Sequence, residues 1–184
     1  IEAIEQAVVR VAMQMAEREG INVKMLLTAE DISAGLDTPV EDRRGLGGCI
    51  PLYKVAGAAA EQGKSLEEVL DVATRFNGQM ATLAVAMTGV THPQNGAVIS
   101  TLPDDEMEIG MGQHGEAGGG RSKILSADET AEKMILPLIE DTKCASGDNA
   151  MLIINGTGAT THMEMNIIFR KANQVLESKG INVA

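Results

Sequence analysis

The sequence predicts an α/β fold, with mixed sheets flanked by helices and with the end of a first α/β domain followed by a second α/β domain. Helical spacing of apolar residues over 2–19 gives way after Gly20 to the alternating pattern of a strand. Two short apolar runs, at 81–87 and 151–154, have the length of buried strands, and a helix-start signal lies between them. The composition agrees, because 44% hydrophobic residues with only 2% aromatics favour cores of small and β-branched side chains.

The first domain is predicted to contribute residues 1–34, as one helix followed by one strand. The helix covers 2–19, and Gly20 supplies a residue that commonly ends helices. Its apolar residues recur at helical spacing, at Ile4, Val8, Val11 and Met15. The strand follows at 21–28 and runs into the acidic pair 30–31.

Residues 35–48 are predicted to connect the two domains rather than to form an element. They contain one proline, four consecutive charged residues and four glycines. A helix is predicted from 51 to 62, because a proline can occupy the first turn. Ser65 and Glu68 have the spacing of a capping box, which predicts a further helix reaching about residue 77.

The second domain is predicted to span 49–184 and to hold a glycine-rich loop. A buried strand is expected at 81–87, and a second strand-like stretch ends at 109–111. Six glycines between 110 and 120 then crowd around His114. Because glycine weakens regular structure, this segment is predicted to be an irregular loop.

The remainder of the chain is predicted to alternate helices and a strand. A capping box at 126–129 starts a helix that Pro137 should kink or interrupt. A buried strand is expected at 151–154, a turn at 155–158 and a helix at 161–178. The final residues enter another strand as the chain stops, which predicts a fragment of a longer subunit.

Charge and hydropathy exclude several functions. A net charge of −11, with no stripe of Lys and Arg, opposes binding to nucleic acid or to anionic membranes. No apolar run approaches the length of a membrane span, and the N-terminus lacks the pattern of a secretory signal, so we expect a cytoplasmic protein. Cys49 and Cys144 lie far apart without a Cys-x-x-Cys partner, which indicates structural thiols.

His114 is the sharpest candidate for chemistry. The surrounding glycines remove side-chain bulk, so a ligand can approach both the backbone and the imidazole. A free imidazole has a pKa of about 6.5 and is mostly neutral at pH 7, when it can act as nucleophile, base or metal ligand. The residues alone leave these roles open, beside the alternative of a structural histidine.

Other polar residues carry weaker signals. The acidic stretch 104–108, together with Glu116, could bind a hard cation, although a solvated acidic turn is favoured. The segment 155–160 lies between a strand and a helix, where an anion can bind, but it lacks the P-loop ending and is read first as a tight turn. His92 and His162 are predicted to be structural.

Arg43 and Arg44 have two alternative interpretations. They could clamp a phosphate or pair with Glu41 and Asp42, and the ion pairs are favoured.

Three separated motifs carry a resemblance to a known family. They are Glu-Asp-Arg-Arg-Gly-Leu-Gly-Gly at 41–48, Lys-Val-Ala-Gly-Ala-Ala-Ala-Glu at 54–61 and Asp-Glu-Met-Glu-Ile-Gly-Met-Gly-Gln-His-Gly-Glu at 105–116. The chain closely resembles the substrate-binding K subunit of dihydroxyacetone kinases (glycerone kinases), and the match continues through Asn-Gly-Thr-Gly-Ala-Thr at 155–160.

The resemblance implies a phosphotransferase with an alcohol group as acceptor. In that family the histidine of the His-Gly-Glu motif, here His114, holds dihydroxyacetone as a covalent hemiaminal. The neighbouring loop residues Gly112, Gln113, Gly115 and Glu116 are then expected to contact the substrate. Dihydroxyacetone or a related ketose such as erythrulose is the expected substrate.

The resemblance also implies how the work is divided between subunits. We expect no cofactor and no metal on this chain, with ATP or ADP and magnesium on a nucleotide-binding L subunit or domain. The phosphate would come from ATP or from the phosphotransferase system, and members of the family are commonly homodimers.

Two family motifs are absent from the sequence. One is a Ser-Gly-His segment that contacts substrate, and the other is a Gly-Asp pair that supplies the catalytic base. The aspartate would fall near Glu5, but Ile4 replaces its glycine, so the base role is not transferred to Glu5. The fragment alone is therefore expected to be inactive.

Two other functions compete with the kinase. A non-catalytic ketone-binding paralogue acting as a transcriptional coactivator would keep His114 and lack the base. A metal-dependent hydrolase would use His114, Glu116 and Asp105.

Overall fold

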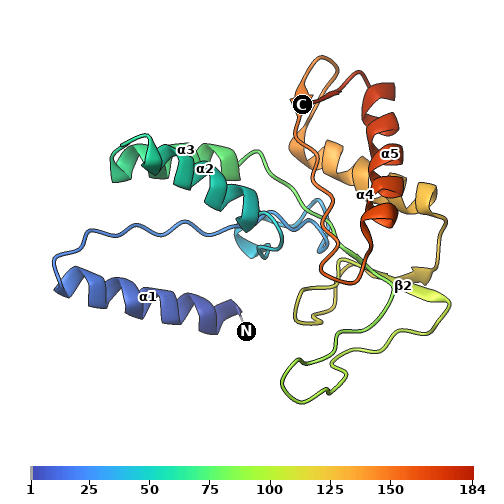
Figure 1. Ribbon diagram of the computed structural model, residues 1–184, viewed down its shortest axis with the longest axis horizontal. Coiled ribbons are helices and arrows are strands. Elements are labelled where there is room, and N and C mark those ends of the chain that lie inside the picture. Colours follow the sequence, from blue (N-terminus) through green and yellow to red (C-terminus); the bar gives the residue numbers. More distant parts are fainter. Residues whose placement is uncertain (1) are drawn as a thin grey trace. The chain divides into compact units, whose positions relative to one another are not determined.

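The computed structural model describes residues 2–184, with side chains from residue 6 onward. The chain forms two compact units (Figure 1). The first contains residues up to 30 together with 44–80, and the second contains 31–43 together with 81–184. The division of a longer protein into domains at 35–48 stays a prediction, because compact units within this chain do not define it.

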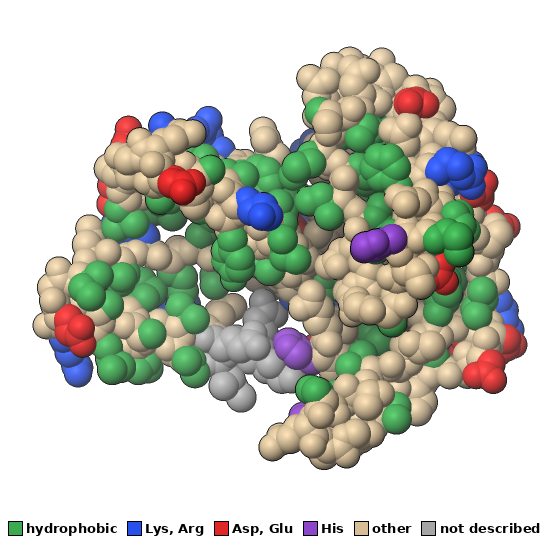
Figure 2. All heavy atoms as spheres, in the orientation of Figure 1, with side chains coloured by type: hydrophobic (Ala, Val, Ile, Leu, Met, Phe, Trp, Pro, Cys, Tyr) green, Lys and Arg blue, Asp and Glu red, His purple; other side chains and the backbone are tan. Residues whose placement is uncertain are grey.

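The first unit begins with helix α1, Glu2–Arg18, as predicted. Gly20 ends it with a φ of +79°. The apolar face of α1 is exposed, and Figure 2 shows its hydrophobic side chains in green. The predicted strand at 21–28 is absent, since a strand exists only through pairing and these residues join no ladder in the described part of the chain.

Two packed helices complete the first unit, α2 at Cys49–Glu61 and α3 at Leu66–Asn77. The predicted capping box is confirmed, because the Glu68 backbone N–H donates to Ser65 Oγ and the Ser65 N–H donates back to the Glu68 carboxylate at 2.8 Å. Before α2, the buried Glu30 carboxylate accepts from the N–H groups of Leu46 and Gly48, at 2.7 and 2.8 Å. A side chain at Gly48 would collide with Glu30, which explains the glycine there.

The second unit contains a short 3-10 helix, Val40–Asp42, and a three-stranded antiparallel sheet. The strands are β1 Val85–Ala86, β2 Glu106–Ile109 and β3 Gly120–Lys123, in the order β1-β2-β3. Only two residues of the predicted strand at 81–87 belong to β1. Strands β2 and β3 are joined by the predicted glycine-rich loop, and their register pairs Ile109 with Gly120.

Helices α4, Ala127–Thr142, and α5, His162–Ser178, pack against each other in the second unit (Figure 1). Their buried core consists of Ile135, Ala172, Val175, Leu176 and Ile181. The capping box of α4 is confirmed. Pro137 does not interrupt α4, which continues as one helix through that residue, and the alternative of a kink stays a prediction.

A parallel pair of short strands, β4 Asn149–Ala150 and β5 Asn182–Val183, lies beside this core. The predicted buried strand at 151–154 is wrong, since Met151 and Ile153 are 58% and 55% exposed. The neighbouring strand β5 is only two residues long, so pairing stops at Ala150. One antiparallel and one parallel sheet with flanking helices confirm the α/β class with mixed sheets.

None of the helices described between residues 2 and 184 is both long and apolar enough to cross a bilayer.

Candidate functional site

The loop that carries His114 spans 110–119 and is closed at its base by the backbone. The Gly110 N–H donates to the Ala84 carbonyl at 2.6 Å, and the Gly119 N–H donates to the Ile109 carbonyl at 2.7 Å. Within the loop, the Gly112 N–H donates to the Glu116 carbonyl at 2.8 Å. The loop therefore forms a hydrogen-bonded turn with His114 near its tip.

The glycines of this loop allow backbone segments to pack without side chains between them. Gly110 has a φ of +79°, and a Cβ there would lie 2.1 Å from Ser33 Cβ. A Cβ at Gly118 would lie 2.1 Å from the Gly110 carbonyl carbon. Neither position has room for a side chain, so these two glycines are required by the packing of the loop. The irregular loop that the glycines predict is present.

His114 and Glu116 form the chemical pair of the loop. The imidazole Nδ1 lies 2.9 Å from Glu116 Oε1, and the His114 backbone N–H donates to Glu116 Oε2 at 3.1 Å. A carboxylate can only accept, so Nδ1 carries the proton in this contact, and whenever the ring is neutral its lone pair is on Nε2. The two side chains are 53% and 38% exposed, which leaves the pair accessible to a ligand.

The Glu116 carboxyl is held in its ionised form. Partial burial favours the neutral acid and so raises its pKa. Hydrogen bonds from its own backbone N–H, from the His114 ring and from the His114 backbone N–H act in the opposite direction and outweigh burial. The pKa of Glu116 consequently lies below its usual value of 4.5, and at neutral pH the carboxylate can accept the Nδ1 proton.

The acidic stretch before the loop does not join this pair. Asp104 and Asp105 lie in an exposed turn, as the favoured interpretation expects, and Asp105 binds Lys123 Nζ at 2.5 Å. Glu108 differs, because it is only 6% exposed. Among the side chains described from residue 6 onward, no three of His, Cys, Asp and Glu are grouped so that they could hold a metal ion. The triad of a metal-dependent hydrolase, His114, Glu116 and Asp105, is therefore not assembled.

Three residues beside the loop were missed by the sequence analysis. The carboxylate of Asp31 is buried and accepts from the backbone N–H and the hydroxyl of Ser33, at 3.0 and 2.9 Å. Ser33 in turn packs under Gly110. Ile99 is 47% exposed and adjoins Gly115. No local sequence signal connects these residues with the loop, because they are distant in the chain.

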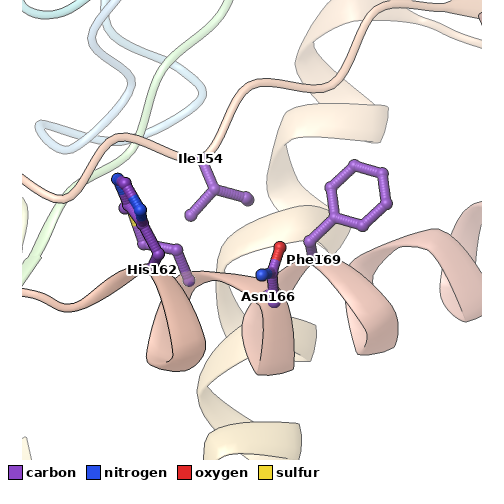
Figure 3. A pocket seen from close by; sticks show the side chains of 5 residues that line it. Ile154, His162, Asn166 and Phe169 are labelled. Atoms are coloured by element: carbon purple, nitrogen blue, oxygen red, sulfur yellow. The ribbon is translucent and has the colours of Figure 1, made fainter.

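The remaining two histidines belong to other segments of the chain. His92 Nδ1 accepts the Gln94 backbone N–H at 3.2 Å, as a structural loop histidine would. His162 begins α5 and lines an open hollow of about 400 Å³ (Figure 3). The other lining residues are Ile154, Met165, Asn166 and Phe169.

The predicted turn before α5 is present, with Thr157 and Gly158 both at positive φ. The Thr157 N–H donates to Asn155 Oδ1 at 3.2 Å, a contact that closes the turn locally. This geometry agrees with the tight turn favoured by the sequence, although no strand directly precedes the turn.

Arg43 is a structural residue, but its partner differs from the prediction. Its guanidinium binds Asp141 of α4 at 2.9 Å rather than Glu41 or Asp42, and it also donates to the Thr38 carbonyl. The Arg43 side chain is 6% exposed, so it is not available as a phosphate clamp. The side chains of Ile4 and Glu5, where the family's base motif would fall, lie outside the described side chains.

Comparison with known proteins gives the same family over nearly the whole chain. The Dak1 domain model matches residues 8–184. The dihydroxyacetone-binding subunit DhaK of PTS-dependent dihydroxyacetone kinase 2 from Listeria innocua is 35% identical over 92% of the chain. That match covers 51% of the relative, so the chain spans about half of its length.

Two solved structures are also similar. A dihydroxyacetone kinase operon co-activator superposes with a TM-score of 0.84 at 29% identity, over 95% of this chain and 54% of that protein. The dihydroxyacetone kinase from C. freundii in complex with AMP-PNP and Mg²⁺ gives a TM-score of 0.76 at 29% identity, over 92% of this chain and 31% of that protein. The family model covers more than half of the chain and agrees with these similarities, and the chain belongs to the Dak1 domain family.

Proposed function

We propose that this chain is the substrate-binding part of a dihydroxyacetone-type ketose kinase and that it holds a short-chain ketose covalently through His114. The observation that carries the proposal is the contact of 2.9 Å between His114 Nδ1 and Glu116, which leaves Nε2 as the nucleophilic nitrogen. Similarity to a dihydroxyacetone-binding subunit supports the choice of ligand. The exposed loop provides access for a small ketose.

The covalent step is addition to a ketone. The Nε2 lone pair forms a bond to the carbonyl carbon, and the π electrons of the carbonyl move to its oxygen. That oxygen takes a proton from solvent, while Nδ1 releases its proton through the Glu116 carboxylate to solvent. The product is a neutral hemiaminal, and the number of protons balances.

This chemistry selects carbonyl compounds. Glycerol can imitate the hydroxyl contacts of dihydroxyacetone, but it has no electrophilic carbon for Nε2 to attack. The hydroxyl groups of the bound ketose would be contacted by Gly112, Gln113, Gly115 and Glu116. One of those hydroxyls is then presented for phosphoryl transfer, in which positioning contributes much of the rate.

The phosphoryl donor is proposed to come from a partner. A nucleotide-binding L subunit or domain would hold ATP or ADP with magnesium, and the similarity to the kinase in complex with AMP-PNP and Mg²⁺ supports this division. The phosphate would originate from ATP or from the phosphotransferase system. A homodimer in the cytoplasm is the expected setting.

Intact mass spectrometry tests the covalent step. The chain is incubated with dihydroxyacetone, and its mass is measured under native conditions and after borohydride treatment. We expect one adduct in the wild type, none in His114→Ala and none with glycerol in place of the ketone. A wild-type chain that stays unmodified by both routes, or an equal adduct in His114→Ala, would refute the assignment.

A coactivator function is the second candidate, favoured by the TM-score of 0.84 to an operon co-activator. Both functions require ketone binding, so phosphoryl transfer must discriminate them. The complete gene product is loaded with dihydroxyacetone and mixed with the ATP-loaded L subunit of a related kinase. Formation of dihydroxyacetone phosphate supports the kinase, and a stable adduct without product supports the coactivator.

A further inference from the structure

We propose that Glu108 is a positioning residue that fixes the conformation of the His114 loop and thereby the reactivity of His114 toward a ketone. The inference rests on the proposed function for its chemical consequence. Its structural part concerns the contacts of Glu108 and can be tested separately.

Glu108 is a buried carboxylate at the foot of the loop. Its side chain is 8% exposed, and it lies in β2 directly opposite Arg121 of β3. Oε2 accepts from Arg121 Nε at 3.4 Å, and Oε1 accepts the backbone N–H of Gly118 at 3.2 Å. Burying a carboxylate is costly unless such partners compensate it, so Glu108 holds both partners in defined places.

Gly118 connects Glu108 with the reactive pair. It lies two residues after Glu116, and its backbone packs directly on the carbonyl of Gly110. A movement of Gly118 therefore shifts the end of the loop from which Glu116 reaches His114. Because glycines permit many backbone conformations, a buried acceptor fixed in a strand restricts the loop to one of them.

Arg121 extends the same support to a neighbouring segment. A second nitrogen of its guanidinium, Nη2, donates to the Thr101 carbonyl at 3.2 Å. Glu108 thus links β2, the end of the loop, β3 and the segment around residue 101. Among the described side chains, no hydrogen bond or ion pair joins Glu108 to His114, so the proposed effect on His114 passes through Gly118.

Glu106 provides a matched control on the same strand. It lies two residues from Glu108, so both side chains leave β2 on the same face. Glu106 lies 3.8 Å from Lys123 Nζ, and its side chain is 28% exposed. Removing the charge of Glu106 therefore leaves the contact with Gly118 intact.

The test compares Glu108→Gln with Glu106→Gln in the full chain. The amide of Glu108→Gln keeps the size of the side chain but removes its negative charge, which weakens the acceptor for the Gly118 N–H. If the amide oxygen stays on Gly118, the amide NH₂ group faces the Arg121 guanidinium, and two donors then oppose each other. Three quantities are measured: the exchange rate of the Gly118 amide proton, the tautomer of His114 from the ring ¹⁵N shifts, and the concentration of dihydroxyacetone that gives half-maximal adduct.

We expect Glu108→Gln to accelerate Gly118 exchange, to reduce the fraction of ring protonated on Nδ1, and to raise the half-maximal ketone concentration roughly tenfold or more. Glu106→Gln should leave all three within about twofold of the wild type, since surface ion pairs contribute little. Wild-type values of all three in Glu108→Gln would overturn the inference. Equal changes in the two variants would do the same.

Two further outcomes are covered by the design. If Glu108→Gln does not fold, Glu108→Asp is measured instead, because it keeps the charge but shortens the reach to Gly118, and the same three changes are required. If the wild type forms no adduct, the proposed function fails, while Gly118 exchange and the His114 tautomer still decide whether Glu108 positions the loop.

Discussion

Gly110 offers a quantitative test of how the loop is packed. A residue other than glycine at its φ of +79° pays about 1–2 kcal/mol for the left-handed conformation. A Cβ there would also lie 2.1 Å from Ser33 Cβ, and forcing that overlap apart adds about 1–3 kcal/mol. We therefore expect Gly110→Ala to lower the free energy of unfolding by about 2–5 kcal/mol.

Two other glycines separate the contributions. Gly96 has a similar φ of +70°, and nothing lies within 4 Å of its added Cβ, so Gly96→Ala should show only the conformational cost of about 1–2 kcal/mol. Gly118 is not at positive φ, but its Cβ would meet the carbonyl carbon of Gly110 at 2.1 Å. Gly118→Ala should therefore show only the cost of overlap, about 1–3 kcal/mol or more.

Urea unfolding followed by circular dichroism measures these differences, with the ketone adduct as a second readout. The free energies are extrapolated to water for each variant. Adduct formation should be lost in Gly110→Ala and Gly118→Ala and retained in Gly96→Ala. A Gly110→Ala variant no less stable than Gly96→Ala would refute the packing of Ser33 beneath the loop.

Three further predictions concern the rest of the chain. Arg43→Ala should destabilise by about 3–5 kcal/mol in urea unfolding, because it removes a buried guanidinium and leaves the Asp141 carboxylate, 16% exposed, without this partner. The exposed Arg75→Ala should change stability by less than about 1 kcal/mol, and equal effects of the two variants would contradict the prediction. The carboxyl ¹³C shift of Glu116 should titrate with a midpoint below 4.5, because the lowered pKa keeps the ionised form until the pH falls below that value. His114→Ala should move this midpoint upward, since it removes the hydrogen bond from the imidazole. An unchanged midpoint would exclude the imidazole contact as a cause of the lowered pKa. Leu176→Ala should cost about 2–5 kcal/mol by the same urea assay, against little for the 71% exposed Met163→Ala, and a cost below about 1 kcal/mol would contradict the α4–α5 core.

Local signals in the sequence were sufficient for the helices. The capping boxes at 65–68 and 126–129 give the correct starts of α3 and α4, because such a box is satisfied within four residues. The same pattern at Thr161 and Glu164 starts α5 and was visible in the sequence, although only the helix itself was predicted there.

Strands could be predicted less well because they depend on distant partners. The apolar patterns at 21–28 and 151–154 resemble strands, but the described chain supplies no ladder for either. The two-residue strand β5 pairs only with 149–150, just before the second run. The ion pair between Arg43 and Asp141 joins residues 98 positions apart, and no local pattern selects it over the acidic residues adjacent to Arg43.

The candidate site shows the same division between local and distant information. Glycines crowded around His114 indicated the loop, and the resemblance to the family's His-Gly-Glu motif brought Glu116 into the prediction. The burial of Glu108 could not be predicted from the sequence, because it depends on the pairing of β2 with β3, which places Arg121 opposite Glu108. Ser33 was missed for a related reason, since only the fold brings it beneath Gly110.

The three carboxylates around the loop differ in what their surroundings let them do. Glu116 is partly exposed and contacts the imidazole, so it can exchange a proton with His114 during addition. Glu108 and Asp31 are buried and hold backbone N–H groups, so their contacts can fix positions. A nucleophile in a glycine-rich loop needs both kinds of carboxylate, because the space that admits a ketose also permits the loop to leave its reactive conformation.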